Sequence, residues 1–196
     1  MATFNISWSN VGIPTNTNVI SQRIEYRRKT VGGAFISTGF TPANNLPTSA
    51  TAASITSLAD NVVFEFRVAA ICTIGGPTYN TNGIRESIKF ICPTVVASTS
   101  DTAVTVTASG LPVDITKVIF NIGTGPISVL TSGGSAAHTF TGLVNSTLYN
   151  VTSEIAAIVN GVELVSTLGT CSTPATTTAP ANCTAPQNLI VSSANS

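Results

Sequence analysis

The chain has 196 residues, enough for two domains of about 90 residues that each bury a modest core. Its formal net charge is zero and only 8% of its residues are charged, so composition favours neither a nucleic-acid partner nor an anionic membrane surface. Mean hydropathy is +0.37, yet no apolar run approaches the roughly 20 residues that span a bilayer. We therefore expect a soluble protein without a membrane segment.

Alternation of apolar and polar residues with a period of two recurs from end to end, and helical periodicity over ten or more residues does not. In the first half this pattern predicts strands over residues 4–8, 22–28, 54–58, 62–71 and 87–91. Alternate residues of a strand face the same side of a sheet. Phe4, Ile6 and Trp8 should therefore share the core-facing side of the first strand.

The second half repeats this order, which indicates a diverged internal duplication. Its predicted strands cover residues 94–97, 103–107, 116–122, 127–130, 138–140, 149–158 and 162–168. Residues 172–181, rich in Pro, Thr and Ala, then break the alternation. Such a composition is typical of an extended linker without a core of its own.

The cysteines and the one histidine give no metal-binding pattern. The cysteines show no CxxC spacing, so we expect no zinc site and no cofactor. Reduced or partly buried thiols are the first interpretation, and a Cys171–Cys183 bridge is the main alternative. The cysteines are Cys72, Cys92, Cys171 and Cys183.

Few residues of this chain could act in catalysis. His138 is the only side chain suited to act as a base near neutral pH, and hydrolytic triads also need a positioned carboxylate and a nucleophile. The eight acidic residues are scattered singly. We therefore expect no catalytic residue and no enzymatic activity, with His138 a partly exposed strand residue.

Two surface features could in principle bind a ligand. The basic cluster Arg23, Arg27, Arg28 and Lys29 alternates with Glu25, a pattern typical of a solvated strand face rather than a phosphate or nucleic-acid site. Carbohydrate sites usually need exposed aromatic side chains. Tyr79 is the only aromatic candidate that this interpretation leaves.

Several residues specify the sandwich type. Residues 58–70 run from a Leu through a turn into an aromatic-Arg-Val strand, and this segment resembles the corner of a fibronectin type III domain. Trp8 matches that family's buried Trp, and residues 143–151 repeat the corner with Tyr149. Two departures are Phe64 in place of the corner Tyr, and no Trp counterpart in the second half. The resemblance implies an all-β chain of two tandem Ig-like, fibronectin type III-like β-sandwiches.

The two ends of the chain resemble adjoining pieces of one such domain. Residues 183–193 look like its first strand and residues 3–9 like its second. We therefore predict a first domain over 1–92 that lacks its first strand, a second over 93–171, a linker over 172–182 and a candidate donor strand over 183–196. Leu189 and Val191 would be the donor side chains, and Phe4, Ile6 and Trp8 the acceptors. A tail that begins a further domain is the alternative.

These features predict a non-enzymatic structural protein that self-associates head to tail, as a homo-oligomer or filament. Low charge and Asn/Thr/Gly-rich strands resemble the accessory proteins of tailed phages, which implies a virion location and other virion or surface proteins as partners. Residues 1–5 show no basic or apolar leader, so we expect synthesis in a host cytoplasm. The alternative is a carbohydrate- or surface-binding module of a larger secreted protein, which would be extracellular.

Overall fold

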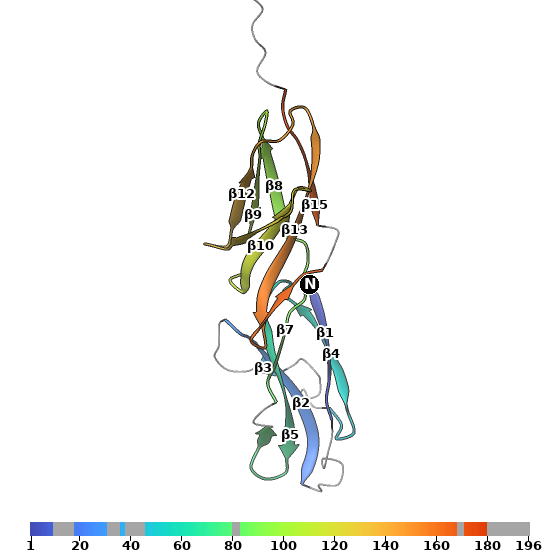
Figure 1. Cartoon of the computed structure of the whole chain (residues 1–196). Helices are drawn as coiled ribbons and strands as arrows, with labels where there is room; N and C mark the ends of the chain where they lie inside the picture. Colours follow the sequence, from blue (N-terminus) through green and yellow to red (C-terminus); the bar gives the residue numbers. More distant parts are fainter. Residues whose placement is uncertain (10–17, 31–35, 38–45, 80–82, 168–170, 180–196) are drawn as a thin grey trace, which may run out of the picture.

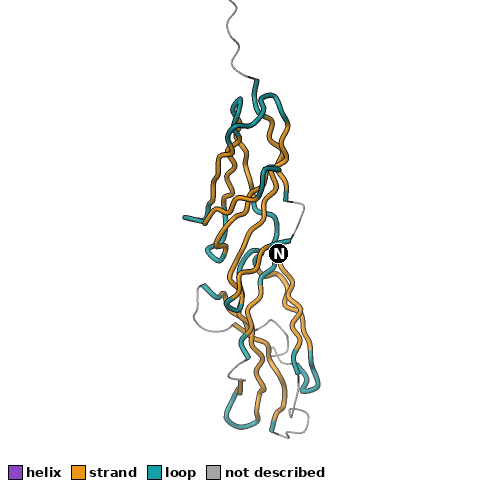
Figure 2. Tube along the Cα trace, viewed as in Figure 1, coloured by secondary structure: helices purple, strands orange, loops and turns teal. Residues whose placement is uncertain are grey.

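The computed structural model describes residues 1–9, 18–30, 36–37, 46–79, 83–167 and 171–179. These residues form strands and no helix, arranged as two β-sandwiches stacked end to end (Figures 1 and 2). No segment among them forms a helix that could cross a membrane. The predicted all-β class is confirmed.

The first sandwich packs a two-stranded sheet, β1 and β4, on a sheet ordered β3-β2-β5-β6, with β7 also pairing β5. Its strands are β1 (Ala2–Ser7), β2 (Val19–Arg28), β3 (Ile36–Ser37), β4 (Ala52–Leu58), β5 (Phe64–Cys72), β6 (Pro77–Tyr79) and β7 (Arg85–Ser87). Aromatic rings fill the core between the sheets, and the rings of Phe4 and Phe66 lie 5.2 Å apart between centroids. The predicted inward alternation of β1 therefore builds this core.

The second sandwich packs a three-stranded sheet, β12-β9-β8, on a sheet ordered β11-β10-β13-β14, with β15 also pairing β13. Its strands are β8 (Thr94–Thr99), β9 (Val104–Ser109), β10 (Ile115–Asn121), β11 (Pro126–Leu130), β12 (Ala136–Phe140), β13 (Leu148–Val159), β14 (Val162–Val165) and β15 (Ser172–Thr176). The Tyr149 hydroxyl accepts a hydrogen bond from the Val144 N–H at 2.9 Å. The predicted corner is thus present in this sandwich.

Two sequence-based expectations are wrong. Residues 88–91 form no strand, and the last strands of the first sandwich are instead β6 and β7. The predicted linker over 172–182 is also wrong for its first part, because Ser172–Thr176 is strand β15 and Ala175 is buried in the core. Threonine suits a strand, and Pro174 is tolerated because β15 lies at a sheet edge. Residues 183–196 lie outside the described residues.

Polar and apolar contacts connect the two sandwiches at a joint. The Glu86 carboxylate accepts hydrogen bonds from Lys29 Nζ at 2.8 Å and from the Asn160 N–H at 2.6 Å, and Asn160 Oδ1 accepts one from the Glu86 N–H. Val63 of the first sandwich is buried within the core of the second, where the partly buried Ile88 also packs. The sandwiches are therefore held at a defined joint, which gives the rod seen in Figure 1.

Cys92 and Cys171 form a disulfide, with their Cα atoms 5.3 Å apart. The expectation of reduced thiols is wrong for this pair, and so is the alternative bridge from Cys171 to Cys183. Cys92 precedes β8 and Cys171 precedes β15, and these two strands contact each other in the second sandwich. The sequence separation of 79 between the two cysteines hides this proximity. Cys183 lies outside the described residues.

We expect Cys171→Ser to lower the free energy of unfolding of the second sandwich by about 2–4 kcal/mol, because the bridge closes a long loop and so restricts the unfolded chain. Cys72→Ser is the matched control, since Cys72 is not in a disulfide. Denaturant unfolding of both variants without reductant measures this. Equal stability of the two variants would contradict a structural role for the bridge.

Candidate functional site: the open edge of the first sandwich

Strand β1 is paired on one edge. It runs antiparallel to β4, with Phe4 opposite Ile55 and Ile6 opposite Ala53. Successive backbone groups of a strand point to alternate edges, so about half of those on β1 point away from β4. Within the described residues no strand pairs with that second edge. An exposed edge of this kind is a template for strand addition.

The second sandwich shows what occupies the equivalent edge in a complete domain. There β9 pairs with β12 on one side and with β8 on the other, and β8 also contacts β15 of the facing sheet. The sheet of the first sandwich has the counterparts of β9 and β12 but, in the described residues, none of β8. That the first sandwich lacks its first strand stays a prediction.

An open hollow of about 640 Å³ lies where a counterpart of β8 would run, and we call it the acceptor groove. Thr3, Phe4 and Asn5 of β1 line one side of it, and residues 87–90, which begin with the last residue of β7, line another. Leu164 and Val165 at the end of β14 close it, so the second sandwich also contributes. Leu164 is 46% exposed, an apolar side chain directed at a groove rather than at a core.

The structure brings the predicted acceptor residues together on one face of the first sandwich. Phe4 is 6% exposed, whereas Ile6 and Trp8 are only half-buried at the edge of the core. A second open hollow, of about 400 Å³, is lined by Ile6 and Ala53 among others. The core is therefore closed at Phe4 and less complete toward Ile6. The predicted donor residues, Leu189 and Val191, lie outside the described residues.

Gln22, which the sequence analysis did not select, anchors the far end of β1. Its fully buried side-chain carbonyl accepts a hydrogen bond from the Trp8 indole N–H at 2.7 Å. Its amide N–H groups donate to the backbone carbonyls of Pro47, Thr48 and Ala50. The alternation that places Ile24 on the inner face also places Gln22 there, and this was the available signal. Trp8 is thereby held in position although one side of its strand is open.

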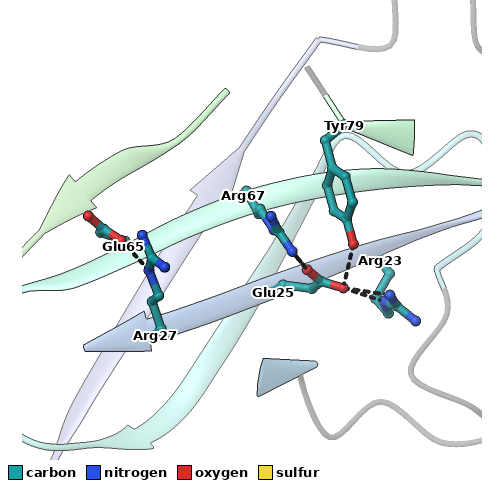
Figure 3. Close-up of polar contacts among 6 residues, drawn as sticks. All are labelled: Arg23, Glu25, Arg27, Glu65, Arg67 and Tyr79. Carbon is teal, nitrogen blue, oxygen red and sulfur yellow. Dashed lines mark hydrogen bonds and ion pairs between the residues drawn. The ribbon is translucent and has the colours of Figure 1, made fainter. Parts of the chain in front are cut away.

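The charged cluster on the outer face of the first sandwich is internally neutralised (Figure 3). Glu25 on β2 accepts hydrogen bonds from Arg23, from Arg67 on β5 and from the hydroxyl of Tyr79. Arg27 pairs with Glu65 in the same way. Because these cations already have carboxylate partners, the cluster is a salt-bridged strand face. This supports the interpretation that was preferred over a phosphate site.

Hydrogen bonding sets the charge of Glu25. Burial alone would raise the pKa of this carboxyl, whose side chain is only 4% exposed, but hydrogen bonds from Arg67, Arg23 and Tyr79 hold the pKa below its ordinary value. Asp114 differs, because burial raises its pKa despite hydrogen bonds from Val63 and Thr30. Glu25 is therefore a structural anion that requires its partners.

The other candidate ligand or catalytic residues are also engaged in packing. The guanidinium carbon of Arg67 lies 3.8 Å from the centre of the Tyr79 ring, so one face of that ring is covered. His138 lies half-buried on β12, as predicted, with its ring edge-on to Phe140. Among the described residues, no group of three or more His, Cys, Asp or Glu side chains is placed to hold a metal ion.

No family model matches the sequence, and no curated protein matches it. Among solved structures, a two-domain fibronectin type III segment from chicken tenascin is similar over 89% of this chain and 92% of that chain, with 18% identity and a TM-score of 0.49. The sheet order of the second sandwich, with β12-β9-β8 facing β11-β10-β13-β14 and β15, and its Tyr149 corner are the features that support the assignment. Both domains are fibronectin type III-like sandwiches, a fold that by itself specifies architecture rather than activity.

We expect Glu25→Gln to lower the free energy of unfolding at pH 7 by about 1–3 kcal/mol, because charge-assisted hydrogen bonds from two arginines are lost. A carboxyl whose pKa is lowered by folding stabilises the protein above its ordinary value of 4.5 and loses this contribution as pH falls through the folded-state pKa. The difference between parent and variant should therefore shrink below about pH 4.5 in urea unfolding.

Glu163→Gln serves as the matched control, because Glu163 pairs with Lys117 while 43% exposed. Exposed ion pairs contribute little, so we expect a change below about 1 kcal/mol. A pH-independent difference for Glu25→Gln, or equal effects of both substitutions, would contradict the anchoring role of the Glu25 charge.

Proposed function

We propose that this protein is a non-enzymatic structural subunit that assembles head to tail by donating its C-terminal strand to the first sandwich of a neighbouring copy. The observation that carries the proposal is the acceptor groove beside β1, at the position that β8 fills in the second sandwich. Strand addition would supply main-chain hydrogen bonds to the free edge and apolar side chains to the open side of the core. Leu189 and Val191, spaced two residues apart, provide such side chains.

Chain geometry favours a neighbouring copy over self-completion. β13 has 12 residues and so extends about 40 Å along the second sandwich. One end reaches the joint, where Lys29 contacts Ile158, and the other lies beside Ser146, which bonds Thr178 after β15. The described chain therefore ends at the pole farthest from the first sandwich (Figure 1).

A donor antiparallel to β1 must enter the first sandwich near Trp8, because β1 begins at the joint and runs away from it (Figure 1). From the far pole that entry point lies about 40 Å along the second sandwich and about 20 Å farther along β1. Residues 180–188 reach at most about 32 Å when fully extended. These residues are therefore too few for the tail to reach the first sandwich of its own molecule.

The contact between neighbours would be heterologous, since donor and acceptor are different surfaces, and such contacts generate rings or open filaments. The donated strand enters at the pole of the first sandwich that faces away from its own second sandwich. Successive rods would thus stack pole to pole along one axis. This arrangement favours an open filament over a closed ring.

As part of the same proposal, we assign the subunit to an accessory structure of a tailed-phage virion, a head decoration, collar, tail or fibre. Low charge and Asn/Thr/Gly-rich strands support this assignment. Other virion or surface proteins would be its partners there. The alternative is a carbohydrate- or surface-binding module of a larger secreted protein; its aromatic candidate for a carbohydrate site, Tyr79, has one ring face covered by Arg67.

We expect Leu189→Asp to abolish self-association, whereas Asn188→Asp should leave it nearly unchanged. Alternation directs Leu189 toward the core of the first sandwich and Asn188 to solvent, and an unpaired carboxylate forced against an apolar core is costly. Sedimentation velocity should show the association constant of Leu189→Asp reduced by about 100-fold or more. Equal behaviour of the two variants would rule out a tail bound as a strand in this alternation.

A further inference from the structure

The two sandwiches can be aligned residue by residue, so that β1 and β4 of the first correspond to β9 and β12 of the second. In the second, Phe140 on β12 precedes the core residue Leu143 by three positions, and in the first, Ile55 on β4 precedes Leu58 by three. Phe140 pairs with Val104, and Ile55 pairs with Phe4. This alignment makes the following residues equivalent: Phe4 and Val104, Ile6 and Val106, Trp8 and Ala108.

Solvent-facing contacts support the same alignment independently. Thr105 on β9 is hydrogen-bonded to Thr139 on β12, with their hydroxyl oxygens 2.9 Å apart. On the first sandwich, Ser54 on β4 donates a hydrogen bond to the side-chain oxygen of Asn5 on β1 at 2.7 Å. Both pairs lie one residue before the Phe140 and Ile55 positions. The polar faces of the two sheets therefore follow the register given by their cores.

Strand β8 then shows which donor position faces each acceptor. Residues 95–99 of β8 read Val-Val-Ala-Ser-Thr, and residues 189–193 of the tail read Leu-Ile-Val-Ser-Ser, with apolar, apolar, apolar, polar, polar side chains in both. In the second sandwich the facing pairs are Val95 with Ala108, Ala97 with Val106, Ser98 with Thr105 and Thr99 with Val104. The tail thus matches the side-chain pattern of β8.

Resting on the proposed strand donation, we infer that the tail of a neighbouring copy docks on β1 in one register, with Leu189 opposite Trp8, Val191 opposite Ile6 and Ser193 opposite Phe4. The half-buried Ile6 and Trp8 then receive the two apolar side chains, and the already buried Phe4 receives the small serine. Size and burial are thus complementary along the strand.

This register also assigns a role to the second sandwich of the acceptor. Residues that follow Ser193 would lie beside Thr3 and Phe4, where the acceptor groove meets Leu164 and Val165. Leu164 and Val165 of β14 line the groove at that end, so the second sandwich of the acceptor would border the end of the docked strand.

Intermolecular disulfide formation tests the register. One chain carries Ser192→Cys and a second carries Asn5→Cys, both in a Cys72→Ser, Cys183→Ser background that retains the Cys92–Cys171 bridge. Directly opposite residues have Cβ atoms about 4.5–5.5 Å apart, whereas residues displaced by two lie about 7–8 Å apart. Only the first separation is close to what a disulfide spans. Ser192 and Asn5 correspond to the facing pair Ser98 and Thr105.

The matched control pairs Ser192→Cys with Ser7→Cys, which is exposed on the same face two residues along β1. We expect mild oxidation to link the Ser192/Asn5 pair at least tenfold faster than the control pair on non-reducing gels. Preferred linkage of the control pair would overturn the register and leave strand donation standing. Absence of both linkages from mixtures that do not associate would overturn the register and the proposed function together.

Discussion

Main-chain hydrogen bonding along β1 is the constraint on which the first sandwich depends. This strand contributes Phe4 to the aromatic core and holds Trp8 on the buried Gln22, yet it is paired to β4 alone among the described residues. The second sandwich resolves the same problem with β8, which covers the equivalent edge and contacts β15. This difference between the two sheets is the feature on which the proposed strand donation is built.

The end-to-end arrangement of the two sandwiches determines which copy a C-terminal strand could reach in the proposed assembly. Glu86 binds Lys29 and Asn160 across the joint, and Val63 is buried in the core of the second sandwich, so the two domains hold one relative orientation. The described chain ends at the pole remote from the acceptor groove. In the proposed assembly the donor and the acceptor would lie at opposite ends of the rod, so a short tail would reach a neighbouring copy rather than its own first sandwich.

Alternation and corner motifs predicted the all-β class, most strands and the positions of Phe4, Ile6 and Trp8, because these depend on local side-chain periodicity. Features that depend on long-range proximity were missed. The Cys92–Cys171 bridge joins strands that only the folded sheet brings together, and the carboxylates that neutralise Arg27 and Arg67 lie on neighbouring strands. Strand β15 was read as a linker because Pro174 and the threonines mimic low-complexity sequence, whereas pairing with β13 decides its structure.

The central claim is tested most directly by supplying the strand in trans. A chain truncated after residue 182 should be monomeric and less stable, since the proposed burial of Leu189 and Val191 would contribute about 2–5 kcal/mol. A synthetic peptide of residues 183–196 should raise its melting temperature in a saturable manner, because a ligand that binds only the folded state stabilises it by mass action. The same peptide should inhibit assembly of full-length chains. A scrambled peptide that acts equally well, or a native peptide without effect at millimolar concentration, would contradict strand donation.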